Sequence, residues 1–338
     1  MDGCPYETLW IKNLSSKPPR IARSLSLDFI GDWGGANFHR ICSWLTQEFC
    51  DRAGPRSRTS IHSSRGGGFE ALQAVHDGEA DLCISTPAMV IEGATNGRGF
   101  FSGRPMPALR ALAVLPQNDR LVLAVRGDLQ INSFEELRRQ KPSLRIATSL
   151  DDPDHLIGWT AARYMEAHGI DSTTLVSWGG GYVSDTRPEQ SLFRMRDGLV
   201  DAVLQEAIMT PWWRDVIATG AVPLAAEESA LKSLESEFGF RRNQLPRGFW
   251  SNLEQDLPTL DFSDFAIVVR EDLAEDVAHL LTWCLVETRQ QLEAQYRHLA
   301  PERSPLSYPL SPEAMARPPL PLHAGAARYY QEAGLTSA

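Results

Sequence analysis

The 338-residue sequence lacks the features that mark several functional classes. No cluster of Lys and Arg is interleaved with aromatic residues, and the formal net charge is −10, so a nucleic acid is not expected as a partner. No apolar run approaches the ~20 residues that span a bilayer, which predicts no membrane insertion. The N-terminal residues lack the apolar core of a secretory signal. The chain as written is therefore expected to be cytoplasmic, or extracytoplasmic if an upstream signal is missing from it.

Cysteine is scarce, and the usual catalytic and cofactor motifs are missing. The five Cys, at positions 4, 42, 50, 83 and 284, are odd in number and form no Cys-x-x-Cys pair, which argues against a disulfide framework or a zinc motif. The eight His form no His-x-x-x-His or His-Glu-x-x-His pattern, and no phosphate-binding glycine motif follows the first predicted strand. We therefore expect no cofactor, no metal and no catalytic residue that sequence alone identifies.

From about residue 25 the chain alternates short β-rich runs with helical runs, the pattern of an α/β fold with a largely parallel sheet. "LSLDFI", "RTSIHS" and "ADLCIS" are predicted strands. A helix is predicted from Phe69 to Asp77, with Gly78 as its stop, and one long helix from 274 to about 299.

Two helix starts have recognisable caps. Ser133 and Glu136 have the spacing of a capping box. Asp152 is predicted as the N-cap of the next helix, with Pro153 at the first helical position.

Two similar segments suggest how the chain is divided. "LVLAVRGDL" (121–129) and "FAIVVREDL" (265–273) each run from an aliphatic strand into Val-Arg-x-Asp-Leu. We predict that they are the two strands by which the chain enters and leaves an inserted lobe, with crossings near Val125 and Val268. Residues 24–122 plus 270–338 then form the first lobe, 123–269 the second, and 1–23 a flexible N-terminal extension.

A glycine-rich run precedes the predicted helix at Phe69. In "SSRGGGFEALQAVHDGEADLCIST", Gly66, Gly67 and Gly68 stand directly before the helix, where unsatisfied N–H groups carry roughly half a positive charge. Such a loop lets an anion approach the backbone. The alternative is that the glycines only make a tight turn.

The order of "GGANFHRICSWL", this glycine-rich run, "LVLAVRGDLQINSFEEL", "RMRDGLVDAVL" and "LPLHAGAARYYQEAGL" resembles the TAXI family of solute receptors for TRAP transporters. The resemblance covers nearly everything from Leu25 to Leu335. It implies a type II periplasmic-binding-protein fold, with two α/β lobes joined by a two-strand hinge and a ligand cleft between them. It also implies a small organic anion, a carboxylate or an amino acid, as ligand, and a TRAP permease as a candidate partner.

Two functions remain open. The first is a solute-binding protein that traps its ligand by hinge closure. The alternative is a cytoplasmic enzyme on the same fold, such as an aromatic-acid decarboxylase, in which Asp151, Asp152, His155 or Glu206 would supply a proton or bind a metal. The chain is expected to be a binding protein rather than an enzyme.

The loop "SLDDPDH" departs from the family, which generally carries a small Gly/Ser/Thr-rich loop there. If Asp151 and Asp152 face the cleft, they would repel an anion and favour an amine, a hydroxyl or a bridging metal. The alternative is that Asp152 only caps its helix.

The candidate ligand-binding residues share a position at a strand end, in the loop after one, or in a loop that the resemblance places near the cleft. Among them, Trp212 is an aromatic wall or a core residue, and Arg247 is a carboxylate partner or a solvent-facing side chain. The full set is Gly34, Gly35, Asn37, Ser64, Gly66, Gly67, Gly68, Ser85, Thr86, Asp151, Asp152, Gln205, Glu206, Trp212 and Arg247.

Overall fold

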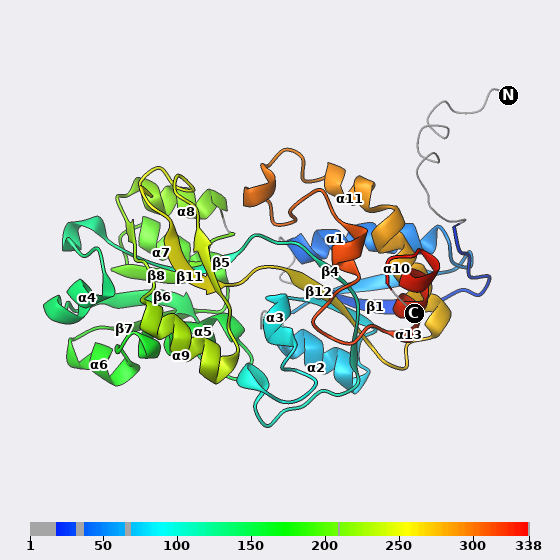
Figure 1. Ribbon diagram of the computed structural model, residues 1–338, viewed down its shortest axis with the longest axis horizontal. Coiled ribbons are helices and arrows are strands. Elements are labelled where there is room, and N and C mark those ends of the chain that lie inside the picture. The colour runs from blue at the N-terminus through cyan, green and yellow to red at the C-terminus, as the bar shows by residue number, and fades with distance from the viewer. Residues whose placement is uncertain (1–17, 32–36, 65–68, 209, 337–338) are drawn as a thin grey trace.

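Two α/β units lie side by side along the long axis of the molecule (Figure 1). The computed structural model describes residues 18–31, 37–64, 69–208 and 210–336. Each unit contains one sheet, and helices cover both faces of that sheet. The expected fold class is confirmed: the chain is a mixed α/β protein with two sheets.

The first unit contains both ends of the described chain. Its sheet runs, in spatial order, β2 (Arg58–Ser63), β1 (Ser26–Gly31), β3 (Leu82–Ser85), β12 (Phe265–Arg270) and β4 (Leu109–Leu115). Its helices are α1 (Asn37–Cys50), α2 (Phe69–Asp77), α3 (Ala88–Ile91), α10 (Glu275–Glu287), α11 (Arg289–Ala294), α12 (Pro312–Met315) and α13 (Ala324–Glu332), with 3₁₀ turns at Gly99–Phe101 and Pro301–Arg303.

The second unit is formed by the middle of the chain. Its sheet runs β10 (Arg242–Leu245), β11 (Leu257–Asp261), β5 (Arg120–Val125), β8 (Ala202–Glu206), β6 (Arg145–Ser149) and β7 (Gly181–Asp185), with β9 (Val222–Pro223) paired to β5. Its helices are α4 (Phe134–Gln140), α5 (Leu156–Ala167), α6 (Ser172–Ser177), α7 (Pro188–Arg196), α8 (Thr210–Ala218) and α9 (Glu228–Phe238), with a 3₁₀ turn at Gly127–Leu129.

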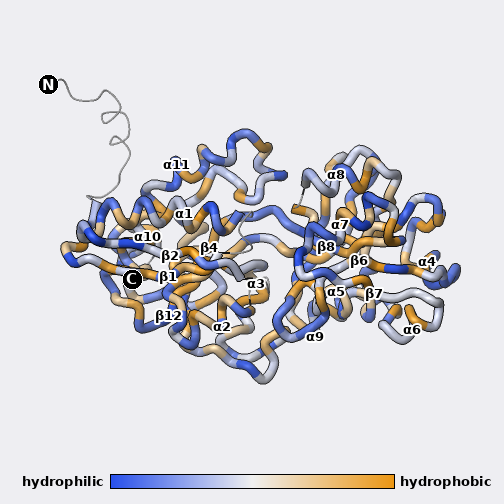
Figure 2. The backbone as a smooth tube through the Cα atoms, turned by 180° about the vertical axis from the view of Figure 1, so that it is seen from behind, coloured by the Kyte–Doolittle hydropathy of each residue, from blue (hydrophilic) through white to orange (hydrophobic). Residues whose placement is uncertain are grey.

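Each sheet is buried between two helical layers. In the first unit α1, α10 and α13 cover one face and α2 the other. In the second unit α4, α5 and α9 cover one face, and α7 and α8 the other. Figure 2 shows apolar residues gathered along the strands of both sheets. Because each fully buried apolar side chain contributes about 1.5–3 kcal/mol, each unit has a substantial core of its own.

The two units repeat one arrangement of strands. The order β2-β1-β3-β12 in the first sheet corresponds to β7-β6-β8-β5 in the second, with the first three strands parallel and the fourth antiparallel in each case. The registers also correspond. Val269 lies opposite Leu82, and Val125 lies opposite Ala202.

This repeat explains the two similar segments and corrects the expected crossings. β5 lies wholly in the second sheet and β12 wholly in the first, so Val-Arg-x-Asp-Leu marks equivalent strands of the two units rather than strands shared between them. The chain passes between the sheets at 116–119 and 262–264. Residues 120–122, expected in the first lobe, therefore lie in the second, and residues 265–269, expected in the second, lie in the first.

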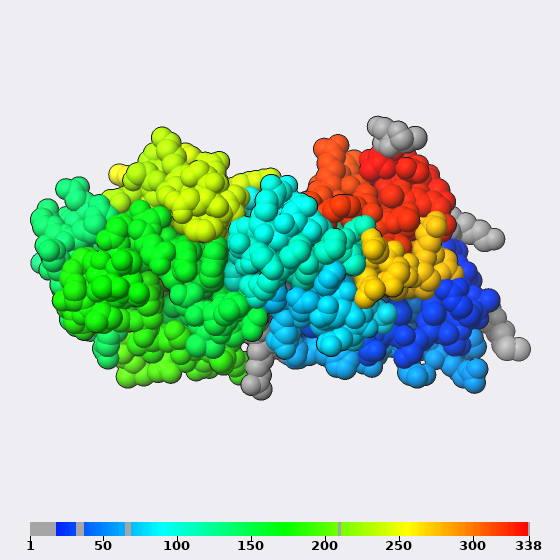
Figure 3. Space-filling view, turned by 90° about the horizontal axis from the view of Figure 1, so that it is seen from below, coloured from blue at the N-terminus to red at the C-terminus, as the bar shows by residue number. Residues whose placement is uncertain are grey.

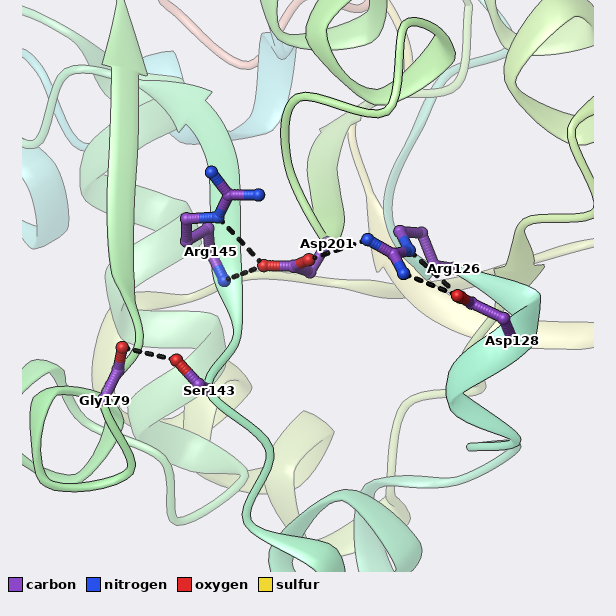
Figure 4. Close-up of polar contacts among 6 residues, drawn as sticks. All are labelled: Arg126, Asp128, Ser143, Arg145, Gly179 and Asp201. Atoms are coloured by element: carbon purple, nitrogen blue, oxygen red, sulfur yellow. Dashed lines mark hydrogen bonds and ion pairs between the residues drawn. The ribbon is translucent and has the colours of Figure 1, made fainter.

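An Asp with the same hydrogen bonds directly precedes the third strand of each repeat. In the first unit the Asp81 carboxylate accepts from the Asp28 N–H at 2.8 Å, and the Asp81 N–H donates to the Asp28 carbonyl. In the second, Asp201 makes the same pair of bonds with Arg145, both at 2.9 Å, and also contacts Arg126 (Figure 4). The aspartates that end "DGEAD" and "DGLVD" therefore tie neighbouring strands together at the amino end of each sheet.

Residues 18–23 pack onto the first unit. Ile21 is buried, its N–H donates to the Arg52 carbonyl, and Arg23 forms an ion pair with Asp276. The expected flexible extension over 1–23 is therefore wrong for this stretch, and residues 1–17 lie outside the described residues. Over the described ranges, no helix combines the length and apolarity that crossing a membrane requires.

Candidate functional site

The carboxyl ends of the parallel strands in both units lie beside the crossing segments. β12 runs antiparallel to β3, with Ala266 opposite the buried Ser85. β5 runs antiparallel to β8, with Leu121 opposite Glu206. Because 262–264 lead directly into β12 and 116–119 directly into β5, the ends of β3 and β8 lie at the two sides of the crossing. Ligands of open α/β sheets bind outside such carboxyl ends, so we place the candidate site here.

The two crossing segments are hydrogen-bonded to each other. The Asp264 N–H donates to the Gln117 carbonyl at 2.9 Å, and the Phe262 N–H donates to the Asp119 carbonyl at 3.1 Å. Asp264 has a left-handed backbone, with φ of 61°, and its carbonyl accepts from the Thr86 hydroxyl at 3.0 Å. The end of β3 is thereby attached to the crossing itself.

Two carboxyl groups meet where the first crossing enters the second unit. Asp119 is fully buried, and one of its carboxylate oxygens accepts from the Arg120 N–H at 2.7 Å and the Ile208 N–H at 2.9 Å. Burial and the neighbouring Glu206 carboxyl raise the pKa of Asp119 well above its ordinary value. The guanidinium of Arg120 donates to the Gln244 carbonyl. The Asp119 carboxyl is therefore protonated over a wider pH range than an ordinary Asp.

Gln205, beside Glu206, belongs to a buried polar cluster at the carboxyl ends of β6 and β8. Its Nε2 donates to Ser149 Oγ at 3.1 Å and Ser191 Oγ at 3.3 Å. Glu189, in the first turn of α7, is also buried, and its Oε1 lies 2.5 Å from Arg187. Within the described part of the chain, Gln205 Oε1 and Glu189 Oε2 have no hydrogen-bond partner.

In the first unit, two predicted site residues make local structural bonds. Ser64 is buried, and its hydroxyl donates to Glu70 in α2 at 3.1 Å. The amide of Asn37, at the start of α1, donates to the Pro305 carbonyl at 2.8 Å and accepts from the Tyr296 hydroxyl. The two bonds of Asn37 attach the C-terminal segment to the start of α1.

Asp151 and Asp152, in the acidic loop of residues 149–155, each lie close to a basic side chain. Asp151 Oδ2 lies 3.8 Å from Arg163, and burial raises the pKa of Asp151. Asp152 Oδ1 accepts from the N–H groups of Asp154 and His155 at 2.8 and 3.0 Å and lies 2.7 Å from His155 Nδ1. Although burial acts the other way, the hydrogen bond with His155 lowers the pKa of Asp152.

These contacts correct the expected helix start. Asp152 closes the turn before the helix, and α5 begins only at Leu156 with His155 as its N-cap. Pro153 is therefore a turn residue. No group of three His, Cys, Asp or Glu side chains is placed to hold a metal ion among the residues that the structure describes.

Arg104 links the two units at this loop. Its guanidinium lies over the rings of Phe69, 3.9 Å from the centroid, and Phe100, both in the first unit. The same group donates to the Pro153 carbonyl of the second unit at 3.0 Å and lies 3.9 Å from Asp154.

An aromatic contact extends this link between the units. Trp159 of α5 packs edge-on against Phe100 of the first unit, with ring centroids 5.4 Å apart, and against Phe238 of α9 at 5.0 Å. Leu156 belongs to the same apolar cluster as Phe69 and Phe100. Figure 3 shows the cyan part of the first unit in contact with the green second unit.

The remaining described candidates lie near the end of β8 or further from it. Trp212 is 36% exposed and packs edge-on against Phe193 of α7, with centroids 6.0 Å apart. Its neighbour Trp213 is fully buried, and its indole N–H donates to the Glu206 carbonyl at 2.7 Å. Arg247 is exposed in the loop between β10 and β11.

The structure therefore places Thr86 beside one crossing segment and Glu206 beside the other. Ser85 precedes Thr86, and Gln205 contacts Ser149 and Ser191. Asn37 and Arg247 lie in other settings. The candidates Gly34, Gly35, Gly66, Gly67 and Gly68 lie outside the described residues.

Sequence reasoning missed several polar residues at the site. Asp119 stands in the polar run "PQND" between two aliphatic strands. That polar run is the only feature of the sequence that could have pointed to Asp119. Ser149, Ser191 and Glu189 carry no motif. Ser149 ends β6 and the other two lie in α7, so the bonds of Gln205 to Ser149 and Ser191 arise only when these distant segments fold together.

Comparisons with known proteins identify relatives of the fold. Residues 52–334 match the model of the NMT1-like family. A solved structure described as a periplasmic transporter is 12% identical and superposes with a TM-score of 0.50, covering 91% of this chain and 92% of its own. The periplasmic binding protein BugD is 9% identical, with a TM-score of 0.50 and coverage of 93% and 99%. No curated protein matches the sequence.

Proposed function

The chain belongs to the NMT1-like family, and from that premise we propose that it is a solute-binding protein, which holds a small organic anion between its two lobes. The observation that carries the proposal is the meeting of the carboxyl ends of β3 and β8 at two hydrogen-bonded crossing segments. Such an arrangement lets two lobes close on a ligand about a hinge. The solved structures similar in fold are described as a periplasmic transporter and a periplasmic binding protein, which supports this function.

The anionic group of the solute would bind at the first lobe. The sequence places Gly66, Gly67 and Gly68 directly before α2, and Gly34 and Gly35 shortly before α1. Backbone N–H groups at a helix start attract an anion, and glycines let it approach closely. We include Ser85, the last residue of β3, and Thr86, which follows it, as hydroxyl groups for the same ligand.

We further assign the protein to the TAXI receptors of TRAP transporters, with a carboxylate or an amino acid as solute, a permease as partner and an extracytoplasmic site of action. This finer assignment is supported by the glycine-rich run with "DGEADL" and by the C-terminal "LHAGAARYYQEAGL".

The test begins with a thermal-shift screen of carboxylates and amino acids, followed by titration calorimetry of each hit. Gly67→Val should abolish binding of a carboxylate hit, because a side chain there would displace an anion from charge-assisted N–H contacts worth roughly 1.5–3 kcal/mol each. The expected loss is at least about tenfold in Kd.

Gly181→Val is the matched control. Gly181 lies in the edge strand β7, where an added Cβ meets nothing within 4 Å, so this variant should keep both fold and affinity. Unchanged affinity in a folded Gly67→Val protein would contradict the assignment of the anion site, and a screen without hits would contradict the function.

One observation favours a second candidate function, an enzyme on the same fold. Asp152 holds His155 Nδ1 at 2.7 Å, and the buried His155 Nε2 has no partner among the described residues, an arrangement suited to proton transfer. Incubating each hit with the protein and following it by NMR decides between the two: conversion of the hit supports the enzyme, and its unchanged recovery supports the receptor.

A further inference from the structure

Because the two units repeat one order of strands, the proposed anion site of the first lobe has a corresponding position in the second lobe. The corresponding aspartates Asp81 and Asp201 set the alignment of the two halves. Counting four residues on from each places Gln205 at the position of Ser85, at the carboxyl end of the third strand. The two lobes therefore offer different polar groups at equivalent places, so they are suited to different ends of one solute.

The Gln205 side chain is held by hydrogen bonds at its amide nitrogen only. It is fully buried, and its Nε2 is held by the hydroxyl groups of Ser149 and Ser191. Its Oε1, an acceptor, has no partner within the described ranges. A buried acceptor left unpaired is destabilising, and a donor on a ligand would remove that penalty.

A second buried acceptor lies in the helix that carries Ser191. Glu189 is 4% exposed, and only its Oε1 contacts Arg187, while Oε2 has no partner among the described residues. Glu189 stands two residues before Ser191 in the first turn of α7, and Ser191 contacts Gln205. Helix α7 thus carries one residue bonded to Gln205 and, two positions earlier, a second buried acceptor oxygen.

The neighbouring acidic loop is a weaker candidate for this role. Asp151 is paired with Arg163, Asp152 with His155, and Asp154 lies near Arg104, so each carboxylate already has a cationic or imidazole partner. The acceptors with unused capacity are in the Gln205 cluster, defined here as Ser149, Glu189, Ser191 and Gln205.

We propose that the Gln205 cluster binds the amine of the solute, with Gln205 Oε1 and Glu189 Oε2 as acceptors. The proposal rests on the proposed function and narrows its substrate class from organic anions in general to amine-bearing acids. A protonated amine supplies several N–H donors and a positive charge, which match a neutral and an anionic acceptor. An acid without an amine leaves both acceptors unpaired.

The experiment compares matched pairs of probes by titration calorimetry: L-glutamate with glutarate, L-alanine with propionate, and 2-aminobenzoate with benzoate. In at least one pair the amine-bearing acid should bind about 10- to 100-fold more tightly, which corresponds to pairing one or two buried acceptors. Equal or tighter binding of the amine-free acids in all three pairs overturns the proposal while leaving the proposed function intact. If none of the six probes binds, this proposal fails, whereas the proposed function fails only if the wider screen of carboxylates and amino acids also gives no hit.

Two substitutions assign the effect to Gln205. Gln205→Met removes the acceptor at similar volume and should reduce the amine preference to less than about threefold, with little change in binding of the amine-free acid. Gln205→Glu keeps an acceptor and adds charge, so it should retain or increase the preference. Gln73→Met, which alters a half-buried glutamine on α2 that donates to Asp77, is the matched control and should leave the amine preference unchanged.

The alternative role of the cluster is purely structural, and the same variants distinguish it. A structural cluster would give a Gln205→Met protein with a lower melting temperature and an unchanged ratio of affinities within each pair. That result overturns the proposal. A lowered ratio in a protein that remains folded supports it, whatever the change in melting temperature.

Discussion

At the scale of single residues, His168 shows how the packed core of the second unit fixes a protonation state. It is 1% exposed and stacked on Phe134, with ring centroids 3.6 Å apart. Its Nδ1 faces the Tyr164 carbonyl at 2.7 Å and its Nε2 accepts from the Glu227 N–H at 3.0 Å. One nitrogen must donate and the other must accept, so the ring is neutral. Burial lowers the pKa of His168 to about 4.

This lowered pKa predicts a loss of stability in acid. The unfolded chain takes up a proton on His168 near pH 6.5, whereas the folded protein resists it down to pH 4. The stabilisation is therefore complete above pH 6.5 and is lost as the pH falls, with a full effect of about 3 kcal/mol below pH 4. The free energy of urea unfolding of wild type and His168→Gln, measured from pH 7.5 to 4, checks this.

The Gln variant carries an NH₂ donor group and a carbonyl acceptor but does not titrate. It should be less stable than wild type at pH 7.5, and the difference between the two proteins should shrink toward pH 4. Parallel pH profiles would show that His168 does not control the acid response.

At the scale of elements, local rules were reliable where the cap and the helix are adjacent in sequence. α2 covers Phe69–Asp77 as predicted, and Gly78 ends it with φ of 79°. Ser133 accepts from the Glu136 N–H at 3.1 Å, which confirms the cap at the start of α4.

Local rules were wrong where tertiary contacts compete with them. Asp152 closes a turn instead of capping α5, because it also binds the imidazole of His155. The long helix expected over 274–299 is interrupted at Thr288, whose hydroxyl donates to the Cys284 carbonyl at 2.7 Å. Hydrophobic periodicity continues through that break, so the sequence pattern alone did not reveal it.

The start of α5 gives a prediction about element packing. A Cβ built on Gly158 would lie 1.7 Å from the Leu150 carbonyl oxygen, because the first turn of α5 packs directly on the end of β6. Gly158→Ala must displace the helix or the strand end, which should cost about 1–3 kcal/mol or more. Chemical denaturation measures the loss, and Gly181→Ala, whose Cβ would have open space, should be nearly silent. Equal stability of the two variants would contradict this close packing.

At the scale of the whole molecule, the sequence predicted two α/β lobes but not their boundaries. The resemblance between the two Val-Arg-x-Asp-Leu segments was visible, but it reflects a repeated strand in each sheet, which only the pairing registers reveal. The candidates Ser85 and Gln205 could be chosen from the sequence because they lie at the carboxyl ends of predicted strands. Ser191 and Asp119 could not be predicted, because their proximity to strand ends depends on how distant segments fold together.

The contact between the lobes gives the last prediction. Arg104 lies over Phe69 in the first unit and donates to the Pro153 carbonyl in the second, so it connects the two lobes outside the crossing segments. Because part-exposed contacts of this kind contribute only about 0.5–1 kcal/mol, Arg104→Ala should leave each unit folded and favour separation of the lobes. We expect a larger radius of gyration in X-ray scattering and a two- to tenfold weaker affinity for any solute that binds by closure. Arg110→Ala is the matched control, since Arg110 pairs with Glu271 within the first unit and its loss should change neither measurement. If the two variants scatter and bind alike, Arg104 does not hold the lobes together, and closure depends on the other contacts between the units, among them the crossing segments, Trp159 and the contact of Arg303 with Phe249.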